Sequence, residues 1–362
     1  MIKNISVEQA LHFPEGVLID VRSEGEFAEG TIPDAINICF LDDEARARVG
    51  TEYKQIGSDR AKRLGLELVS PRLSQMVQRY DQITAKDKKV VLFCWRGGMR
   101  SKFVAQLLDM MGFEVYLVEG GYKAYRRHVN AYFNQALSQR AVVVHGLTGV
   151  GKTLLLRKLA ENGLPVLDLE GLAVHRGSVF GKVGLPQSPT QKGFESLIFN
   201  ALKESEPAGI FLVECESKRL GRLLVPTAVM ESMKKGYKIL LYSPLEVRVR
   251  RSLDEYTIGF DEEENINQLL EATKLLEKYL GRKKVELLQK LIADGLMDKA
   301  VELLLVQYYD PLYRYSDGPS SEYDLSVDTT DIDFAVQKIT SFVTSLPEYN
   351  VPVNGGICYG NR

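Results

Sequence analysis

Short apolar runs alternate with segments of helical periodicity in the first third of the chain. The runs 17–21 and 89–93 are almost wholly apolar, as in strands buried on both faces of a parallel sheet. Between Ser101 and Met111 apolar residues recur every three or four positions, and Gly112 and a third apolar run at 115–118 follow. This order of strand, loop, helix and strand predicts a βαβ unit, and therefore an α/β domain with a parallel sheet.

A second alternation of the same kind begins at residue 141. The predicted strands are 141–144, 164–167, 210–213, 238–242 and 323–327, with a helix at 154–161 after the first strand. From 262 to 308 the apolar residues follow a period of 3.6, which predicts a helical insertion. The pattern as a whole predicts a second α/β domain with a helical subdomain.

The boundaries of the two domains follow from the segments between and after the patterns. We expect the first domain at 1–128 and the second at 141–346. The polar segment 129–140 is predicted to be a helical connector, and 347–362, rich in Gly, Asn and Pro, a loose tail.

The amino-acid composition is typical of a globular protein. The chain has 362 residues, a net charge of -2, 45% hydrophobic and 26% charged residues, as in a globular protein without the basic excess of a nucleic-acid coat. Its cysteines are far apart and form no CxxC pair, so neither a disulfide framework nor a zinc site is indicated: Cys39, Cys94, Cys215 and Cys358. Without a signal segment or an apolar run of about 18 residues, we expect a cytoplasmic protein that does not bind membranes.

An anion-binding loop is predicted where the run 89–93 ends. Cys94 follows the run directly and the next residues open the predicted helix, so the loop lies between a strand end and a helix N-terminus. Backbone N–H groups, a helix N-terminus and cations stabilise a thiolate, the nucleophilic form of cysteine. Glycines let the N–H groups turn inward, and arginines grip oxyanions. We therefore predict catalytic roles for Cys94, Arg96 and Arg100, and an anion loop that includes Gly97, Gly98, Met99 and Ser101.

The first 128 residues resemble the rhodanese family. The resemblance is carried by 18–23, 26–27, 30–37, the Cys94 loop and 120–122. It implies that Cys94 carries a chalcogen, as a persulfide or its selenium counterpart. Five residues separate Cys94 from Arg100, one more than in most sulfurtransferases of this family and the same number as in the related cell-cycle phosphatases. We therefore expect the loop to accept a phosphate-sized ligand.

The segment Gly146 to Thr153 matches the P-loop pattern G-x-x-x-x-G-K-T and lies between a predicted strand and a predicted helix. Glycines permit a close approach of the backbone to phosphate oxygens, the lysine reaches the terminal phosphates, and the threonine hydroxyl is suited to magnesium. We predict phosphate binding at Gly146, Gly149, Gly151, Lys152 and Thr153.

The sequence leaves open the roles of the acids and of the further cations near the P-loop. Glu214 and Glu216 end a predicted strand and are either metal ligands or structural acids, and Asp168 competes for the role of ligand or base. We assign no resident metal and treat magnesium as compatible with the loop. Further candidates for phosphate or RNA contacts are Arg176, Ser178, Arg248 and Arg251.

A rhodanese-like segment followed by a P-loop segment resembles the tRNA 2-selenouridine synthases. Segments 94–101, 120–126, 175–181 and 191–195 extend the resemblance to nearly the whole chain. It implies an enzyme that acts on 2-thiouridine at the wobble position of tRNAs for Lys, Glu and Gln. Geranyl diphosphate first alkylates the sulfur, and selenium from selenophosphate then displaces the S-geranyl group. No tightly bound cofactor is implied.

The chemistry of each loop indicates which of the two phosphorylated substrates it binds. We predict that the P-loop holds geranyl diphosphate and that the Cys94 loop receives selenophosphate, while the reverse assignment also fits the sequence. The rival interpretation is a rhodanese-type phosphatase or sulfurtransferase coupled to an ATP-binding, kinase-like domain. Trp95 either stacks on a base or packs on the domain face, and His175 either assists the chemistry or RNA binding or makes ordinary hydrogen bonds.

Overall fold

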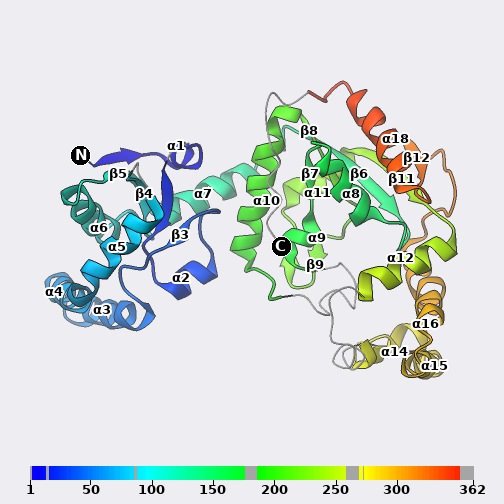
Figure 1. Ribbon diagram of the computed structural model, residues 1–362, viewed down its shortest axis with the longest axis horizontal. Coiled ribbons are helices and arrows are strands. Elements are labelled where there is room, and N and C mark those ends of the chain that lie inside the picture. The colour runs from blue at the N-terminus through cyan, green and yellow to red at the C-terminus, as the bar shows by residue number, and fades with distance from the viewer. Residues whose placement is uncertain are drawn as a thin grey trace. The chain divides into compact units, whose positions relative to one another are not determined.

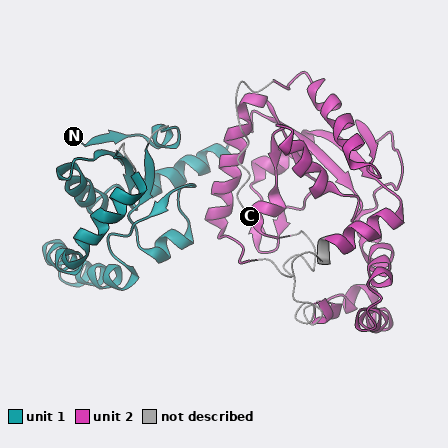
Figure 2. Cartoon of the chain, viewed as in Figure 1, with its two compact units in different colours: residues 1–134 teal, residues 135–362 magenta. Residues whose placement is uncertain are grey.

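Two compact units make up the chain, 1–134 and 135–362 (Figure 2). The computed structural model describes residues 2–13, 16–84, 88–175, 186–257, 269–271 and 273–350. Both units are built on parallel sheets with helices packed around them (Figure 1). The α/β class predicted for each half of the chain is confirmed.

The sheet of unit 1 has five parallel strands in the order β1-β5-β4-β2-β3. They are β1 (Lys3–Ile5), β2 (Val17–Asp20), β3 (Ile36–Asn37), β4 (Lys89–Phe93) and β5 (Glu114–Val118). The side chains from Val90 to Phe93 on the central strand β4 are fully buried, as expected for a parallel strand covered on both faces. The Cys94 loop therefore begins at the carboxyl edge of the sheet.

The helices of unit 1 surround this sheet. They are α1 (Val7–Leu11), α2 (Glu24–Glu29), α3 (Asp43–Gln55), α4 (Ser58–Val69), the 3-10 turn η1 (Ser70–Arg72), α5 (Leu73–Thr84), α6 (Met99–Met110) and α7 (Gly121–Phe133). Helix α7 continues past the expected boundary at 128, because Tyr122, Tyr125 and Val129 share one buried face. The first five residues of the expected connector thus form the end of this helix.

The larger sheet of unit 2 has five parallel strands in the order β12-β11-β6-β8-β7, and β9 and β10 form a separate antiparallel pair. The strands are β6 (Arg140–Gly146), β7 (Val166–Leu167), β8 (Ile210–Glu214), β9 (Arg219–Leu220), β10 (Leu223–Leu224), β11 (Tyr237–Tyr242) and β12 (Leu325–Asp328). Central strand β6 leads into the P-loop, so both predicted anion loops follow the middle strand of a parallel sheet.

Helices and a helical subdomain complete unit 2. The elements around the sheet are α8 (Lys152–Glu161), α9 (Leu169–Ala173), α10 (Gln191–Ser205), the 3-10 turn η2 (Glu206–Ala208), α11 (Thr227–Lys235), α12 (Leu245–Thr257) and α18 (Ile332–Thr344). The subdomain contains α14 (Glu277–Leu280), α15 (Arg282–Ala293), α16 (Met297–Leu304), the π-helix η3 (Leu305–Tyr309) and α17 (Asp310–Tyr313). It has a hydrophobic core of its own, centred on Leu276, Leu288 and Leu305.

Residues 347–350, the described part of the expected loose tail, pack on unit 2. Tyr237 Oη donates to Glu348 Oε2 at 3.0 Å, and the Asn350 N–H donates to the Ala208 carbonyl at 3.0 Å. Residues 351–362, with Cys358, lie outside the described residues. None of the helices in the described ranges combines the length and apolarity needed to cross a bilayer.

Candidate functional site

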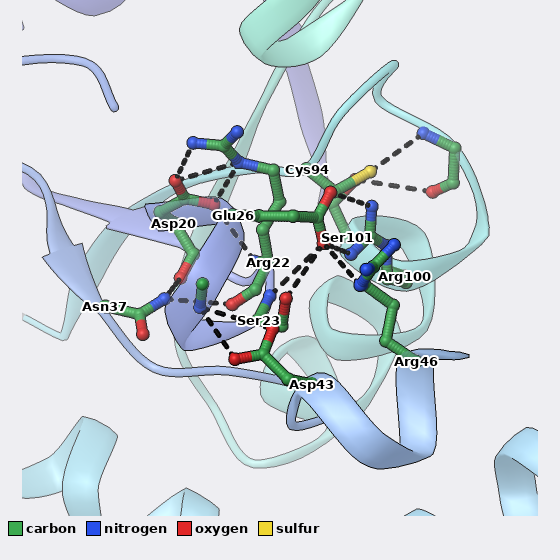
Figure 3. A network of polar contacts seen from close by, with 12 residues as sticks. Asp20, Arg22, Ser23, Glu26, Asn37, Asp43, Arg46, Cys94, Arg100 and Ser101 are labelled. Carbon is green, nitrogen blue, oxygen red and sulfur yellow. Dashed lines mark hydrogen bonds and ion pairs between the residues drawn. The ribbon is translucent and has the colours of Figure 1, made fainter. Parts of the chain in front are cut away.

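The sulfur of Cys94 lies at the N-terminus of α6, where two donors converge on it (Figure 3). The Gly98 N–H and the Ser101 hydroxyl each donate to Cys94 Sγ at 3.2 Å. Cys94 is only 3% exposed and Ser101 is fully buried. Hydrogen-bond donors at a helix N-terminus are the kind of environment in which cysteine nucleophiles lie.

The backbone of 120–122 supports the Cys94 loop from below. The Tyr122 N–H donates to the Cys94 carbonyl at 2.9 Å, and the Lys123 N–H donates to the Trp95 carbonyl at 2.9 Å. A Cβ at Gly121, whose φ is +57°, would lie 2.1 Å from the Cys94 carbonyl oxygen. Only glycine fits this crossing, which explains the paired glycines after β5.

The two glycines of the cysteine loop differ in conformation, although both were expected to curl the backbone. Gly97 has a φ of +63°, and a Cβ there would lie 3.0 Å from the Val118 carbonyl. Gly98 has a φ of -95° and open space around the position of a Cβ. Gly97 makes the turn, and Gly98 keeps the space above the helix N-terminus clear.

Arg100 is held by a carboxylate that the prediction from the loop alone did not include. Its two terminal nitrogens donate to Glu26 at 2.5 and 3.2 Å, and Arg46 approaches the same carboxylate at 3.8 Å (Figure 3). Burial raises the pKa of Glu26, but the hydrogen bonds and charge of Arg100 outweigh burial, and the net pKa shift is downward. The positive charge expected from Arg100 is thus partly compensated, while Arg96 is exposed.

Residues at the end of β2 and directly after it pack against the segment that supports the Cys94 loop. Asp20 and Arg22 are buried and form an ion pair of 2.5 Å, and Arg22 also donates to the Gly30 carbonyl at 2.7 Å. The Arg22 guanidinium lies 4.0 Å from the ring centroid of Tyr122, in the supporting segment. Residues that carry the rhodanese resemblance therefore act through the backbone beneath Cys94.

Apolar side chains lie on the rim of the cysteine loop. The Trp95 ring is 36% exposed and its centroid lies 5.8 Å from that of Tyr122. The Met99 side chain is 60% exposed. Trp95 packs on the unit and also presents ring surface to solvent, so both of its expected roles remain compatible with the structure.

The P-loop has the backbone geometry that its glycines predict. Gly146, Gly149 and Gly151 have positive φ values of 150°, 82° and 88°. A Cβ at Gly149 would lie 2.6 Å from the Arg248 carbonyl oxygen, so helix α12 packs directly on the loop. Lys152 Nζ donates to the carbonyls of Gly146 and Leu147 at 3.1 and 3.4 Å, and thus lies over the loop.

Arg248 and Arg251 hold the P-loop through its carbonyls. Arg248 is 4% exposed; its Nε donates to the Thr148 carbonyl at 2.8 Å and its terminal nitrogens pair with Asp310 at 2.5 and 3.1 Å. Arg251 donates to the Val150 carbonyl at 2.9 Å and to Thr329. The structure thus places both arginines against the loop backbone, with Arg248 buried and Arg251 partly exposed, and the expected phosphate or RNA contacts stay predictions.

The P-loop threonine pairs with one of the competing acids. Thr153 Oγ1 donates to Glu214 Oε1 at 2.8 Å, whereas Asp168 caps α9 by accepting from the Gly171 N–H at 2.8 Å. Burial raises the pKa of Glu214 to about 7, against the opposing effects of Lys152 and the Thr153 hydrogen bond. Glu214 is therefore the acid nearest to a P-loop metal position.

Glu170 lies close to Glu214 and was not predicted from the sequence. Carboxylate oxygens of Glu170, Glu214 and Glu216 lie within 4.8 Å of one another. Burial raises the pKa of Glu216 as well. Hard oxygen ligands beside a P-loop threonine fit magnesium. The position of Glu170, two residues beyond Asp168, is the sequence feature that could have pointed to it.

The remaining predicted residues are either structural or outside the described part. Arg176 and Ser178 lie outside the described residues. His175 is 9% exposed and its ring lies against Gly221. His145, at the end of β6, was not among the predicted site residues. Burial lowers its pKa to about 4, and its ring packs edge-on against Tyr315 and Tyr323.

A unit with a cysteine-headed loop is thus joined to a unit with a P-loop. The rhodanese-like domain model matches residues 5–128, and the model described as tRNA 2-selenouridine synthase AAA domain matches 139–331. The chain belongs to the tRNA 2-selenouridine synthase family.

Individual relatives agree with this assignment. The tRNA 2-selenouridine synthase of Psychromonas ingrahamii is 34% identical over 322 residues, covering 82% of this chain and 87% of the relative. That of Shewanella loihica is 36% identical over 336 residues, covering 84% and 88%. Among solved structures, shikimate kinase from Bacteroides thetaiotaomicron is similar to 57% of this chain and 98% of its own, at 18% identity and a TM-score of 0.27.

Proposed function

We propose that this chain converts 2-thiouridine at the tRNA wobble position into 2-selenouridine, by prenyl transfer followed by selenium transfer. Membership of the family supports a tRNA-modifying enzyme. The observation that supports a two-step reaction is the presence of two loops suited to anions. One begins at Cys94, and the other is the P-loop, whose Thr153 donates to Glu214. The substrate tRNAs are those for Lys, Glu and Gln, and the enzyme works in the cytoplasm.

The first step takes place at the P-loop. The sulfur of 2-thiouridine attacks C1 of geranyl diphosphate; the carbon–sulfur bond forms and the diphosphate leaves with the electron pair of the carbon–oxygen bond. The proton on N3 of the base passes to solvent. Lys152 and the loop N–H groups stabilise the charge on the leaving diphosphate. Thr153 and Glu214 would hold magnesium, which adds positive charge at the same phosphates.

The second step takes place at the Cys94 loop, which receives selenophosphate. Cys94 Sγ attacks selenium and the sulfur–selenium bond forms. The electron pair of the selenium–phosphorus bond leaves with phosphorus, which is thereby reduced from P(V) to P(III) and departs as phosphite. The terminal selenium then attacks C2 of the base and geranyl thiolate leaves. An external thiol reduces the remaining sulfur–selenium bond by two electrons and frees both Cys94 and the selenouridine.

Separate assays of the two half-reactions test this division. Cys94→Ser is expected to accumulate S-geranylated RNA and to form no selenouridine. Lys152→Ala is expected to slow geranylation by on the order of 10² and to leave selenation of pre-geranylated RNA intact. Intact-mass analysis of a 2-thiouridine RNA follows both. Selenouridine at the normal rate from Cys94→Ser, or equal losses in both half-reactions for Lys152→Ala, would contradict the proposal.

The need for a thiol tests the carrier role of Cys94 by itself. The route through Cys94 requires two electrons from a thiol, whereas direct attack on C2 by the selenium of bound selenophosphate requires none. A single turnover of pre-geranylated RNA without thiol is expected to stop before free selenouridine forms. Full conversion without thiol would show that Cys94 only holds the selenophosphate.

A further inference from the structure

An apolar cavity of about 50 Å³ lies in unit 2 between the P-loop and the helical subdomain. Its wall includes Thr148 of the P-loop, Ile292 of α15, Ala300 and Val301 of α16, and Leu305 and Tyr309 of η3. Apart from hydroxyl groups, these side chains offer no polar partner to a ligand. The cavity therefore suits a hydrocarbon group.

The cavity borders the P-loop. Ser252 of α12 lines the cavity, and its Oγ lies 2.8 Å from the position of a Cβ on Gly149. Thr148 lines it from the loop itself, while its carbonyl accepts the hydrogen bond from Arg248. The P-loop therefore forms part of the cavity wall.

Part of the cavity wall is a π-helix, which is an irregular form of helix. The π-helix η3 carries both Leu305 and Tyr309 into the cavity lining, and Asp310, which follows it, pairs with Arg248. Single turns of π-helix are rare and occur frequently at functional sites. The same short segment therefore shapes the cavity and fixes the arginine that holds the P-loop.

The volume sets the size of the occupant. An apolar cavity of about 150 Å³ accommodates a benzene molecule, so a cavity of about 50 Å³ accommodates roughly two or three carbon atoms. The branched end of a prenyl chain, a carbon that carries two methyl groups, has this size. Geranyl consists of two isoprene units, and the distal one has this branched end.

We infer that this cavity binds the branched end of the distal isoprene unit of the prenyl diphosphate whose phosphates lie at the P-loop. The inference rests on the proposed function and adds the site that selects chain length. A nucleotide base is a poorer occupant, because its ring nitrogens and exocyclic groups need polar partners that the lining, beyond its hydroxyls, does not offer.

Chain-length selectivity of the full-length enzyme tests the site. The substrates are a 2-thiouridine RNA with dimethylallyl, geranyl or farnesyl diphosphate, and the readout is the ratio of kcat/KM values among the three donors. Ala300→Phe fills the cavity and is expected to lower kcat/KM for geranyl diphosphate by about tenfold or more, with little effect on the dimethylallyl donor. Ile292→Ala enlarges the cavity and is expected to shift the preference towards farnesyl diphosphate.

Leu287→Ala is the matched control on helix α15. Leu287 is 48% exposed and does not line the cavity, so the ratios are expected to stay at their wild-type values. If Ala300→Phe does not fold, the farnesyl-to-geranyl ratio of Ile292→Ala decides. Unchanged ratios in a cavity variant that still transfers geranyl would overturn the cavity assignment and leave the proposed function standing. A wild-type enzyme that transfers no prenyl group would overturn both.

Discussion

At the scale of single residues, burial decides the charge of the acid beside the P-loop. The pKa of Glu214 is raised to about 7 from an ordinary value of 4.5 because the side chain is buried. The folded state thus favours the protonated form. The contribution of Glu214 to the free energy of unfolding is largest below about pH 4.5 and is lost as the pH rises through 7.

Metal affinity is expected to follow the opposite trend. Magnesium needs the carboxylate, so its binding displaces one proton below pH 7. We predict that magnesium affinity rises by about tenfold per pH unit below pH 7 and is level above it. Titration calorimetry between pH 5.5 and 8 measures the profile, and Glu214→Gln is expected to abolish it. The same profile in Glu214→Gln would assign the proton to another group.

At the scale of elements, the crossing of two backbone segments shapes the cysteine loop. Gly121 has a φ of +57° and no room for a Cβ, whereas Gly98 has a φ of -95° and open space. We predict that Gly121→Ala lowers the free energy of unfolding by more than the roughly 1–2 kcal/mol of a left-handed alanine. Gly98→Ala is expected to change it by less than about 1 kcal/mol. Urea unfolding measures both, and equal effects would count against the crossing as the cause.

Helix α12 is expected to act on the P-loop rather than on RNA. Because Arg248 holds the Thr148 carbonyl and pairs with Asp310, Arg248→Ala should weaken binding of inorganic diphosphate by about tenfold. The slope of log affinity for tRNA against log salt should not change. Arg250→Ala, on the exposed neighbour, is the control for diphosphate binding. A fall in the slope of about 0.7–0.9 in Arg248→Ala would instead indicate a phosphate contact with RNA.

At the scale of the whole molecule, the proposed function assigns one half-reaction to each unit. Units 1–134 and 135–362 each have their own sheet and hydrophobic core. We predict that a mixture of full-length Cys94→Ser and Lys152→Ala proteins converts 2-thiouridine RNA into selenouridine, because the first protein supplies geranylated RNA to the second. Mass analysis of the RNA checks this. No product from the mixture, with both half-reactions intact, would mean that the intermediate does not pass between molecules.

The sequence by itself determined the two α/β units and both anion loops. Buried parallel strands appear as apolar runs, and loops such as Cys94 to Ser101 and Gly146 to Thr153 depend on residues that are adjacent in the chain. These features are local, so their pattern is visible without the fold. The end of α7 and the packing of Glu348 were missed, because packing against distant residues decides them.

Only the tertiary structure decided which side chains serve these loops. Arg100 and Glu26 are 74 residues apart in the chain, Thr153 and Glu214 are 61 apart, and Arg248 lies 100 residues from Thr148. No local spacing relates such residues, since their distances are set by the order of strands in the sheet. The same holds for the cavity, whose lining comes from the P-loop and four helical elements. Local pattern specifies a loop, but the packing of distant segments specifies its partners and the ligand that it accepts.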